Sequence, residues 1–179
     1  MAVDMDDFWV FGYGSLMWNP GFAFEDKMTA RAFGYRRSLC VRSFVHRGTP
    51  ERPGLVLGLD HGGSCRGMAF KVGLKDKDDV IGYLRERELV THVYLERTMP
   101  ILLADGRRVA ALTYTIDRAH AQYAGALSAE DAAATVAISH GKSGPNTDYV
   151  VNTLAHLKEM GIRDHWLEEV VALVERAKR

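Results

Sequence analysis

Two closely spaced glycines beside a small hydroxyl residue are the first feature of this sequence that could do chemistry. Gly12, Gly14 and Ser15 directly follow a short apolar run. A tight loop of this kind can turn its backbone N–H groups toward an anion or a developing oxyanion. The alternative is a glycine-rich strand end that binds no ligand, and these residues alone leave both interpretations open.

Two well-known glycine motifs do not fit this loop. A dinucleotide-binding fingerprint would need a third glycine where Met17 stands, and Asn19-Pro20-Gly21 prevents a helix from starting there. The nucleophile elbow of hydrolases has the order G-x-S-x-G, which the residues around Ser15 do not follow. We therefore do not expect Ser15 to act as a covalent nucleophile.

Helical phase singles out one carboxylate, Glu88. At about 100° per residue, Glu88 lies about 20° from Ile81 on the apolar face, whereas Glu86 lies about 140° away and faces solvent. A buried carboxylate is costly unless it is paired, protonated or used in chemistry, and burial raises its pKa. The alternatives are a structural ion pair with Arg85 or Arg42, or a helix that ends before Glu88.

The other polar residues do not support a metal or phosphate site. The seven histidines form neither an H-E-x-x-H motif nor a Cys/His cluster, and His46 receives no role. Segment 141–146 has the composition of a phosphate loop but not its spacing, so we expect a surface turn that leads into a helix. We expect no metal and no cofactor.

Strands dominate the first two thirds of the chain that must position these residues. Short apolar runs between turn signals such as His61-Gly62-Gly63 predict several antiparallel strands. These runs are 8–11, 39–45, 55–59, 67–72, 99–103 and 109–116. Asp105-Gly106 favours a tight hairpin between the last two, because glycine takes a positive φ without steric cost.

Helices dominate the last third. Ser128 with Asp131 resembles a capping box, and apolar residues at helical spacing predict further helices over 149–160 and 166–178. These apolar stripes are expected to face the core. The expected architecture is a β-rich unit, open or closed, with helices packed around it.

Composition and charge restrict the class of protein. The 179 residues are 47% hydrophobic and 26% charged, which predicts one compact domain over 1–179. The balance of 23 Lys+Arg against 23 Asp+Glu gives no general attraction to nucleic acid or to anionic membranes. Residues 1–7 are acidic where a secretory signal would be basic, and no apolar run has the length of a membrane span. With two cysteines that lack disulfide or zinc spacing, we expect a cytoplasmic protein.

Five ordered segments resemble the ChaC-like γ-glutamylcyclotransferases. They are Phe11–Phe22, Gly34–Arg37, Ser43–Thr49, Tyr83–Glu88 and Ser143–Tyr149. The resemblance runs from about Phe8 to Gly161. It implies an α+β fold, a small β-barrel of mostly antiparallel strands with flanking α-helices, and cofactor-independent cleavage of glutathione to 5-oxoproline and Cys-Gly.

The resemblance also implies which residues form the site. The family's catalytic glutamate corresponds to Glu88, which helical phase indicates independently. The substrate-binding positions correspond to Tyr13, Gly14, Ser15, Leu16, Tyr94 and Tyr149. Between Glu88 and Tyr94 the chain has Leu-Val-Thr-His-Val where a glycine often precedes the tyrosine in relatives, which leaves the choice of γ-glutamyl substrate open.

The implied reaction is an intramolecular one, in which the α-amine of a γ-glutamyl group attacks its own γ-carbonyl. Glu88 would move the proton, and the backbone N–H groups of 13–16 would hold the substrate's carboxylate or the oxyanion. Two alternatives remain: the same reaction on other γ-glutamyl peptides or amines, and a non-catalytic module that binds a γ-glutamyl metabolite. Either way, the expected partner is a small molecule, with no nucleic acid or membrane involved.

Overall fold

The computed structural model describes residues 7–179, and the rest of the acidic N-terminal segment, residues 1–6, lies outside the described residues. The chain divides into two compact units. The first contains residues 7–37 and 59–117, and the second contains residues 38–58 and 118–179. Strands β2 (Asp26–Ser43) and β3 (Gly54–Val72) each contribute to both units. The expectation of a single domain over 1–179 stays a prediction.

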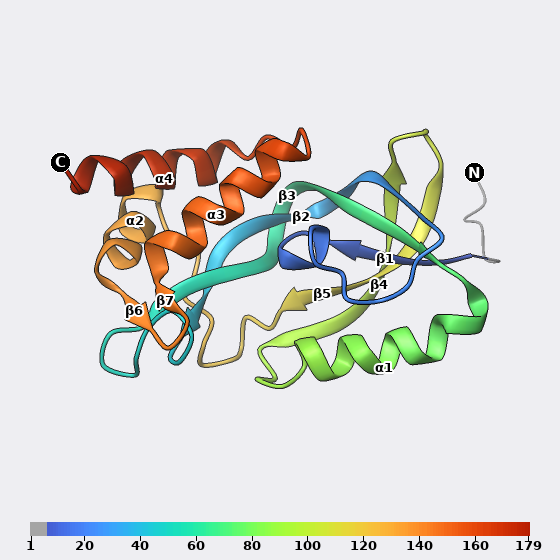
Figure 1. Ribbon diagram of the computed structural model, residues 1–179, viewed down its shortest axis with the longest axis horizontal. Coiled ribbons are helices and arrows are strands. Elements are labelled where there is room, and N and C mark those ends of the chain that lie inside the picture. The colour runs from blue at the N-terminus through green and yellow to red at the C-terminus, as the bar shows by residue number, and fades with distance from the viewer. Residues whose placement is uncertain (1–6) are drawn as a thin grey trace. The chain divides into compact units, whose positions relative to one another are not determined.

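Five strands form a closed barrel in the order β1-β3-β2-β4-β5 (Figure 1). The remaining three strands are β1 (Phe8–Gly12), β4 (Tyr94–Leu103) and β5 (Arg108–Ile116). The pairs β1/β3, β2/β4 and β4/β5 are antiparallel, whereas β1 and β5 pair in parallel. The backbone of β1 is thus paired with β3 on one side and with β5 on the other, and residues 9–12 are buried.

The predicted hairpin around Asp105-Gly106 is confirmed. Strands β4 and β5 flank it, and Gly106 has a φ of +89°, which glycine adopts without the strain of a side chain. The register of this hairpin places Glu96 directly opposite Tyr114. That pairing becomes important at the site described below.

The prediction of separate strands at 55–59 and 67–72, with a turn at His61-Gly62-Gly63, is wrong. Strand β3 runs without a break from Gly54 to Val72. Gly62 and Gly63 lie inside it with φ values of +102° and +70°. Their positive φ values let the backbone depart locally from strand geometry without ending the strand.

Strand β2 is likewise longer than predicted. It begins at Asp26 and ends at Ser43, whereas the apolar run predicted a strand over 39–45 only. Gly34 lies within it at a φ of +83°. The first part of β2 is mostly exposed and half-buried, so it carries few of the apolar residues that reveal a strand in the sequence.

Helix α1 (Lys77–Glu88) follows β3 through the 3₁₀ turn η2 (Leu74–Asp76). It buries Val80 and Leu84. Figure 1 shows α1 alongside the barrel, and its Arg85 binds Glu96 of β4 with two hydrogen bonds. The prediction of a helix through this region is therefore confirmed, and the helix includes Glu88 as its last residue.

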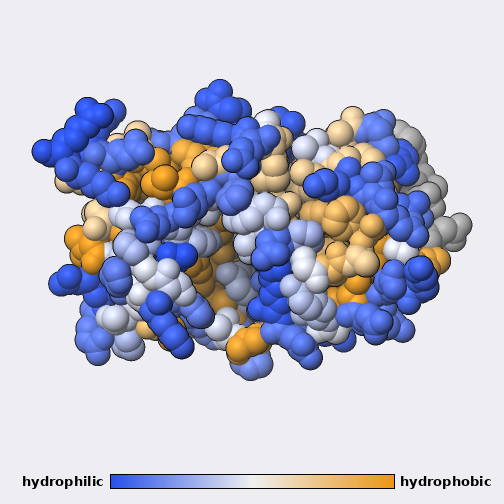
Figure 2. Space-filling view, viewed as in Figure 1, coloured by the Kyte–Doolittle hydropathy of each residue, from blue (hydrophilic) through white to orange (hydrophobic). Residues whose placement is uncertain are grey.

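Three helices pack against one another in the second unit (Figure 1). They are α2 (Ala129–Ile138), α3 (Asn146–Glu159) and α4 (His165–Ala177), and their buried stripes confirm the predicted apolar faces. Ser128 caps α2 by accepting a hydrogen bond from the Asp131 N–H at 3.1 Å. The exposed end of α4 is hydrophilic (Figure 2).

Residues 141–146, predicted to form a surface turn that leads into a helix, lie largely in a small hairpin. It consists of β6 (His140–Gly141) and β7 (Gly144–Pro145), and α3 begins directly after it. Within residues 7–179, no helix combines the length and the apolar character that a membrane crossing requires.

Candidate active site

The glycine-rich segment at the end of β1 forms a tight turn. After Gly12 the chain enters a one-turn 3₁₀ helix, η1 (Ser15–Met17), whose first hydrogen bond runs from the Met17 N–H to the Gly14 carbonyl at 2.9 Å. Ser15 and Leu16 come before Met17 in the chain, so their N–H groups donate no hydrogen bond within this turn. The Leu16 side chain is buried, whereas Ser15 is exposed.

Buried contacts fix the start of this loop. The Arg37 side chain is 6% exposed, and its guanidinium donates to the carbonyls of Tyr13 and Arg66, both at 2.6 Å. Gly67 packs so closely that a Cβ there would overlap the Gly12 carbonyl oxygen. The loop therefore has a fixed conformation, as a preorganised binding loop requires.

Glu88 lies at the end of α1 with only 18% of its side chain exposed. Burial raises the pKa of this carboxyl, and the neighbouring Arg87 guanidinium partly opposes that rise. The prediction that Glu88 faces inward while Glu86 is exposed is confirmed. Arg85 is not the ion-pair partner that the sequence offered, because it binds Glu96 instead. The observed partner is Arg87, whose Nε lies 3.6 Å from Glu88 Oε1.

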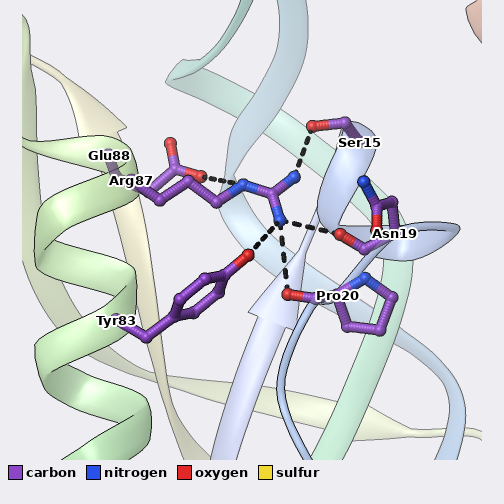
Figure 3. Close-up of polar contacts among 6 residues, drawn as sticks. All are labelled: Ser15, Asn19, Pro20, Tyr83, Arg87 and Glu88. Carbon is purple, nitrogen blue, oxygen red and sulfur yellow. Dashed lines mark hydrogen bonds and ion pairs between the residues drawn. The ribbon is translucent and has the colours of Figure 1, made fainter.

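Arg87 brings the loop and the carboxylate together. Figure 3 shows its guanidinium between Glu88 on one side and the glycine-rich loop on the other, with Nη2 donating to Ser15 Oγ at 2.9 Å. The structure thus joins two features that are more than 70 residues apart in the sequence. This cluster, composed of Ser15, Arg87 and Glu88, is the candidate active site.

A second polar network lies beside Glu88. The Tyr114 hydroxyl donates to Glu96 Oε2 at 3.0 Å, and Arg85 binds both oxygens of the same carboxylate. Hydrogen bonding to Arg85 lowers the pKa of Glu96. The pKa of Tyr114 is raised by burial, by its bond to Glu96 and by the negative charge of Glu88, so the phenol stays protonated.

Sequence reasoning missed this network, although a signal for it was present. The hairpin centred on Asp105-Gly106 fixes the register, and counting outward from the turn pairs Glu96 with Tyr114. Arg87 was also missed as a partner, because its loop contacts depend on tertiary structure.

The two predicted tyrosines lie in different units. Tyr94 is half-buried at the first position of β4, five residues after Leu89, where the preceding turn begins. Within that turn His92 has a φ of +58°, a conformation that favours glycine. Tyr149 belongs to α3 of the second unit, where its hydroxyl accepts the Leu57 N–H at 3.0 Å. Roles for both tyrosines in substrate binding stay predictions.

Three other features of the described residues bear on the chemistry. Within 7–179, no group of three or more His, Cys, Asp or Glu side chains is arranged to hold a metal ion. His46, left without a role, is hydrogen-bonded through Nδ1 to Ser143 Oγ at 2.9 Å in the second unit. A cavity of about 320 Å³ in the first unit is lined by Lys77, Ile81 and Glu96 among others, and its lining residues include neither Glu88 nor the loop.

Comparisons with known proteins agree with this picture. A family profile described as ChaC-like protein matches residues 8–177. The chain is 33% identical to the glutathione-specific γ-glutamylcyclotransferase of Escherichia coli (strain K12), covering 94% of this chain and 73% of that protein. It is 30% identical to the human glutathione-specific γ-glutamylcyclotransferase 1, covering 96% of this chain and 80% of the relative.

Solved structures show the same fold. The crystal structure of a yeast γ-glutamylcyclotransferase specific to glutathione superposes with a TM-score of 0.82 at 22% identity, covering 97% of this chain and all of that one. The expected α+β fold, a small β-barrel with flanking helices, is thereby confirmed.

Proposed function

Since this chain belongs to the ChaC-like family, we propose that it is a γ-glutamylcyclotransferase that cleaves glutathione to 5-oxoproline and Cys-Gly. Curated relatives that are 30–33% identical over most of the chain bear the name of this activity, which supports the choice of glutathione. The observation that carries the proposal is the largely buried Glu88, held by Arg87 beside the turn at Ser15.

The proposed reaction closes a ring within one substrate molecule. The α-amine nitrogen of the γ-glutamyl group bonds to the γ-carbonyl carbon, and the bond from that carbon to the cysteine nitrogen breaks. One proton leaves the attacking amine and one joins the departing amine, so no water is consumed. Because nucleophile and electrophile share one molecule, the enzyme needs to hold the curled conformer, move the proton and stabilise the oxyanion.

Glu88 is proposed to carry the proton. An ammonium titrates near pH 8 and an ordinary glutamate near 4.3, so an ordinary glutamate is a weak base for this step. Burial raises the pKa of Glu88 and narrows that difference. Catalysis by a general acid or base is most efficient when its pKa lies near the working pH, and it contributes about 10² to 10⁴ in rate.

The glycine-rich loop is proposed to hold negative charge on the substrate. The N–H groups of Ser15 and Leu16 are not consumed by their own turn, and Tyr13 and Gly14 complete the same backbone curve. Their fixed position favours binding either the α-carboxylate of the γ-glutamyl group or the oxyanion on its γ-carbon. An oxyanion donor of this type contributes about 10² to 10³ in rate.

Another γ-glutamyl peptide or amine is the second candidate substrate. The turn before Tyr94 favours this alternative. His92 in that turn adopts the left-handed conformation, and it lies close to Glu88 in the sequence. We propose that Tyr94 contacts the substrate, so that a change in the chain before Tyr94 alters which leaving group fits.

The test is incubation of the purified protein with reduced glutathione, with 5-oxoproline and Cys-Gly measured by mass. Parallel reactions with γ-glutamyl dipeptides separate the two candidate substrates. Binding that stabilises the protein without forming product would instead indicate a non-catalytic module. Absence of 5-oxoproline from every γ-glutamyl substrate would contradict the proposed function.

We place this activity in the cytoplasm. Cys40 and Cys65 are buried thiols, which fits a reducing compartment where glutathione is abundant in its thiol form.

A further inference from the structure

One arginine side chain contacts both the turn at Ser15 and the Glu88 carboxylate of the proposed site. Arg87 is the penultimate residue of α1, and its side chain is 21% exposed. Its guanidinium has five partners from two segments of the chain (Figure 3). Three of these partners belong to the glycine-rich loop, and two belong to its own helix.

The partners of Arg87 are divided among its three nitrogens. Nη2 donates to Ser15 Oγ at 2.9 Å. Nη1 donates to the Asn19 carbonyl at 2.7 Å and to the Pro20 carbonyl at 3.2 Å. Nε faces the Glu88 carboxylate at 3.6 Å. One planar group therefore bridges both ends of the segment 15–20 and joins that segment to Glu88.

Tyr83 also binds the guanidinium. Its hydroxyl accepts a bond from Arg87 Nη1 at 3.2 Å. Gly21 leaves room for that hydroxyl, because a Cβ there would overlap it, and the φ of Gly21 is +73°. The plane of the guanidinium is thus fixed by contacts that the loop conformation and the helix provide together.

Only an arginine can make this set of contacts. A lysine ammonium carries the same charge but is a single point on a flexible stem, whereas guanidinium presents donors in a rigid fork. Lysine at this position could approach either the loop carbonyls or the carboxylate, and it would not hold both in a fixed relation.

The charge of Arg87 also acts on Glu88. Arg87 from α1 lowers the pKa of Glu88 against the effect of burial, and Tyr114 from β5 faces the same carboxylate as a neutral phenol. Arg85 and Glu96 neutralise each other one turn away. Arg87 is therefore the cation whose position sets how readily Glu88 ionises.

We propose that Arg87 is a positioning residue that fixes the substrate loop relative to Glu88 by its fork of donors and separately favours the charged form of Glu88 by its cation. This rests on the proposed function, in which Glu88 carries the proton. Arg87→Lys separates these two contributions, because lysine keeps the positive charge but lacks the forked set of donors.

The experiment compares Arg87→Lys and Arg87→Gln with the wild type, with Arg31→Gln as control because Arg31 is an exposed arginine of β2. Measured quantities are kcat and KM for glutathione over pH and the titration of the Glu88 side chain by carboxyl ¹³C NMR. Both Arg87 variants should raise KM roughly tenfold or more, the loss expected when hydrogen bonds to a charged group are removed.

The pH readouts distinguish the two variants. Loss of the cation raises the pKa of Glu88, so Arg87→Gln should move both the NMR titration and the acid limb of kcat/KM to higher pH. Arg87→Lys should leave both close to the wild-type position. A wild-type KM together with an unmoved titration in Arg87→Gln would overturn the proposal.

Failure of the proposed function gives a different result. If Glu88→Gln turned over glutathione at the wild-type rate, Glu88 would not be the base. The NMR titration of Glu88 in the Arg87 variants does not depend on turnover, so an unmoved titration in Arg87→Gln would still overturn the electrostatic part of the role of Arg87.

Discussion

Arg87 Nε lies 3.6 Å from Glu88 Oε1, and the same guanidinium donates to Ser15 Oγ at 2.9 Å. Burial and the neighbouring Arg87 cation thus have opposite effects on the pKa of Glu88. Burial drives Glu88 toward its neutral form, and Arg87 holds it within reach of the charged form. A group that exchanges a proton during each turnover needs both forms to be accessible.

The raised pKa of Glu88 predicts a pH-dependent effect on stability. The folded state binds the proton of the Glu88 carboxyl more tightly than the unfolded state does. The stability that protonated Glu88 contributes is therefore complete below the unfolded pKa and is lost as pH rises through the folded pKa. Glu88→Gln stays neutral throughout. Its Tm relative to wild type should therefore increase between pH 4 and pH 8, measured by thermal melting.

Glu86→Gln is the matched control for that series, because Glu86 lies on the same helix with an exposed side chain. A Tm difference for Glu88→Gln that decreased as pH rose would show that the carboxylate is stabilised, not destabilised, by its folded surroundings.

Two glycine substitutions should have opposite effects. Gly67→Ala places a Cβ against the Gly12 carbonyl and the Phe11 ring, and overpacking of this kind costs about 1–3 kcal/mol. Gly82→Ala lies within α1 with no neighbour near the added Cβ, and it should stabilise by about 0.5–1 kcal/mol. Chemical denaturation measures both. Equal effects would mean that the close approach at Gly67 does not restrict the loop.

The network beside Glu88 should show energetic coupling. Tyr114→Phe removes a hydrogen bond to Glu96 and should cost about 1 kcal/mol. Once Glu96→Gln has removed the charged acceptor, the same change should cost less. A double-mutant cycle by chemical denaturation measures the difference. Strict additivity would indicate that the two side chains do not depend on each other.

Helical period and turn chemistry were sufficient to predict part of the site and fold. Glu88 was found because helical phase places it about 20° from Ile81 on the apolar face, and a local period indicates which side chains face inward. The hairpin at Asp105-Gly106 followed from the conformational freedom of glycine, a property of the residue itself.

The misses have a different physical origin. Gly62-Gly63 has the local character of a turn, yet tertiary pairing carries β3 through it. Folding of the barrel brings Ser15 and Asn19 close to Arg87. No local sequence pattern indicates whether Arg85 or Arg87 will bind them.

The most direct test of the central claim is the rate of 5-oxoproline formation from glutathione by Glu88→Gln and by Glu86→Gln. The first variant keeps the shape of the side chain but cannot accept a proton, so we expect the rate to fall by about 10² or more while the protein melts cooperatively. The second variant should retain the wild-type rate. A fully active Glu88→Gln would contradict the account.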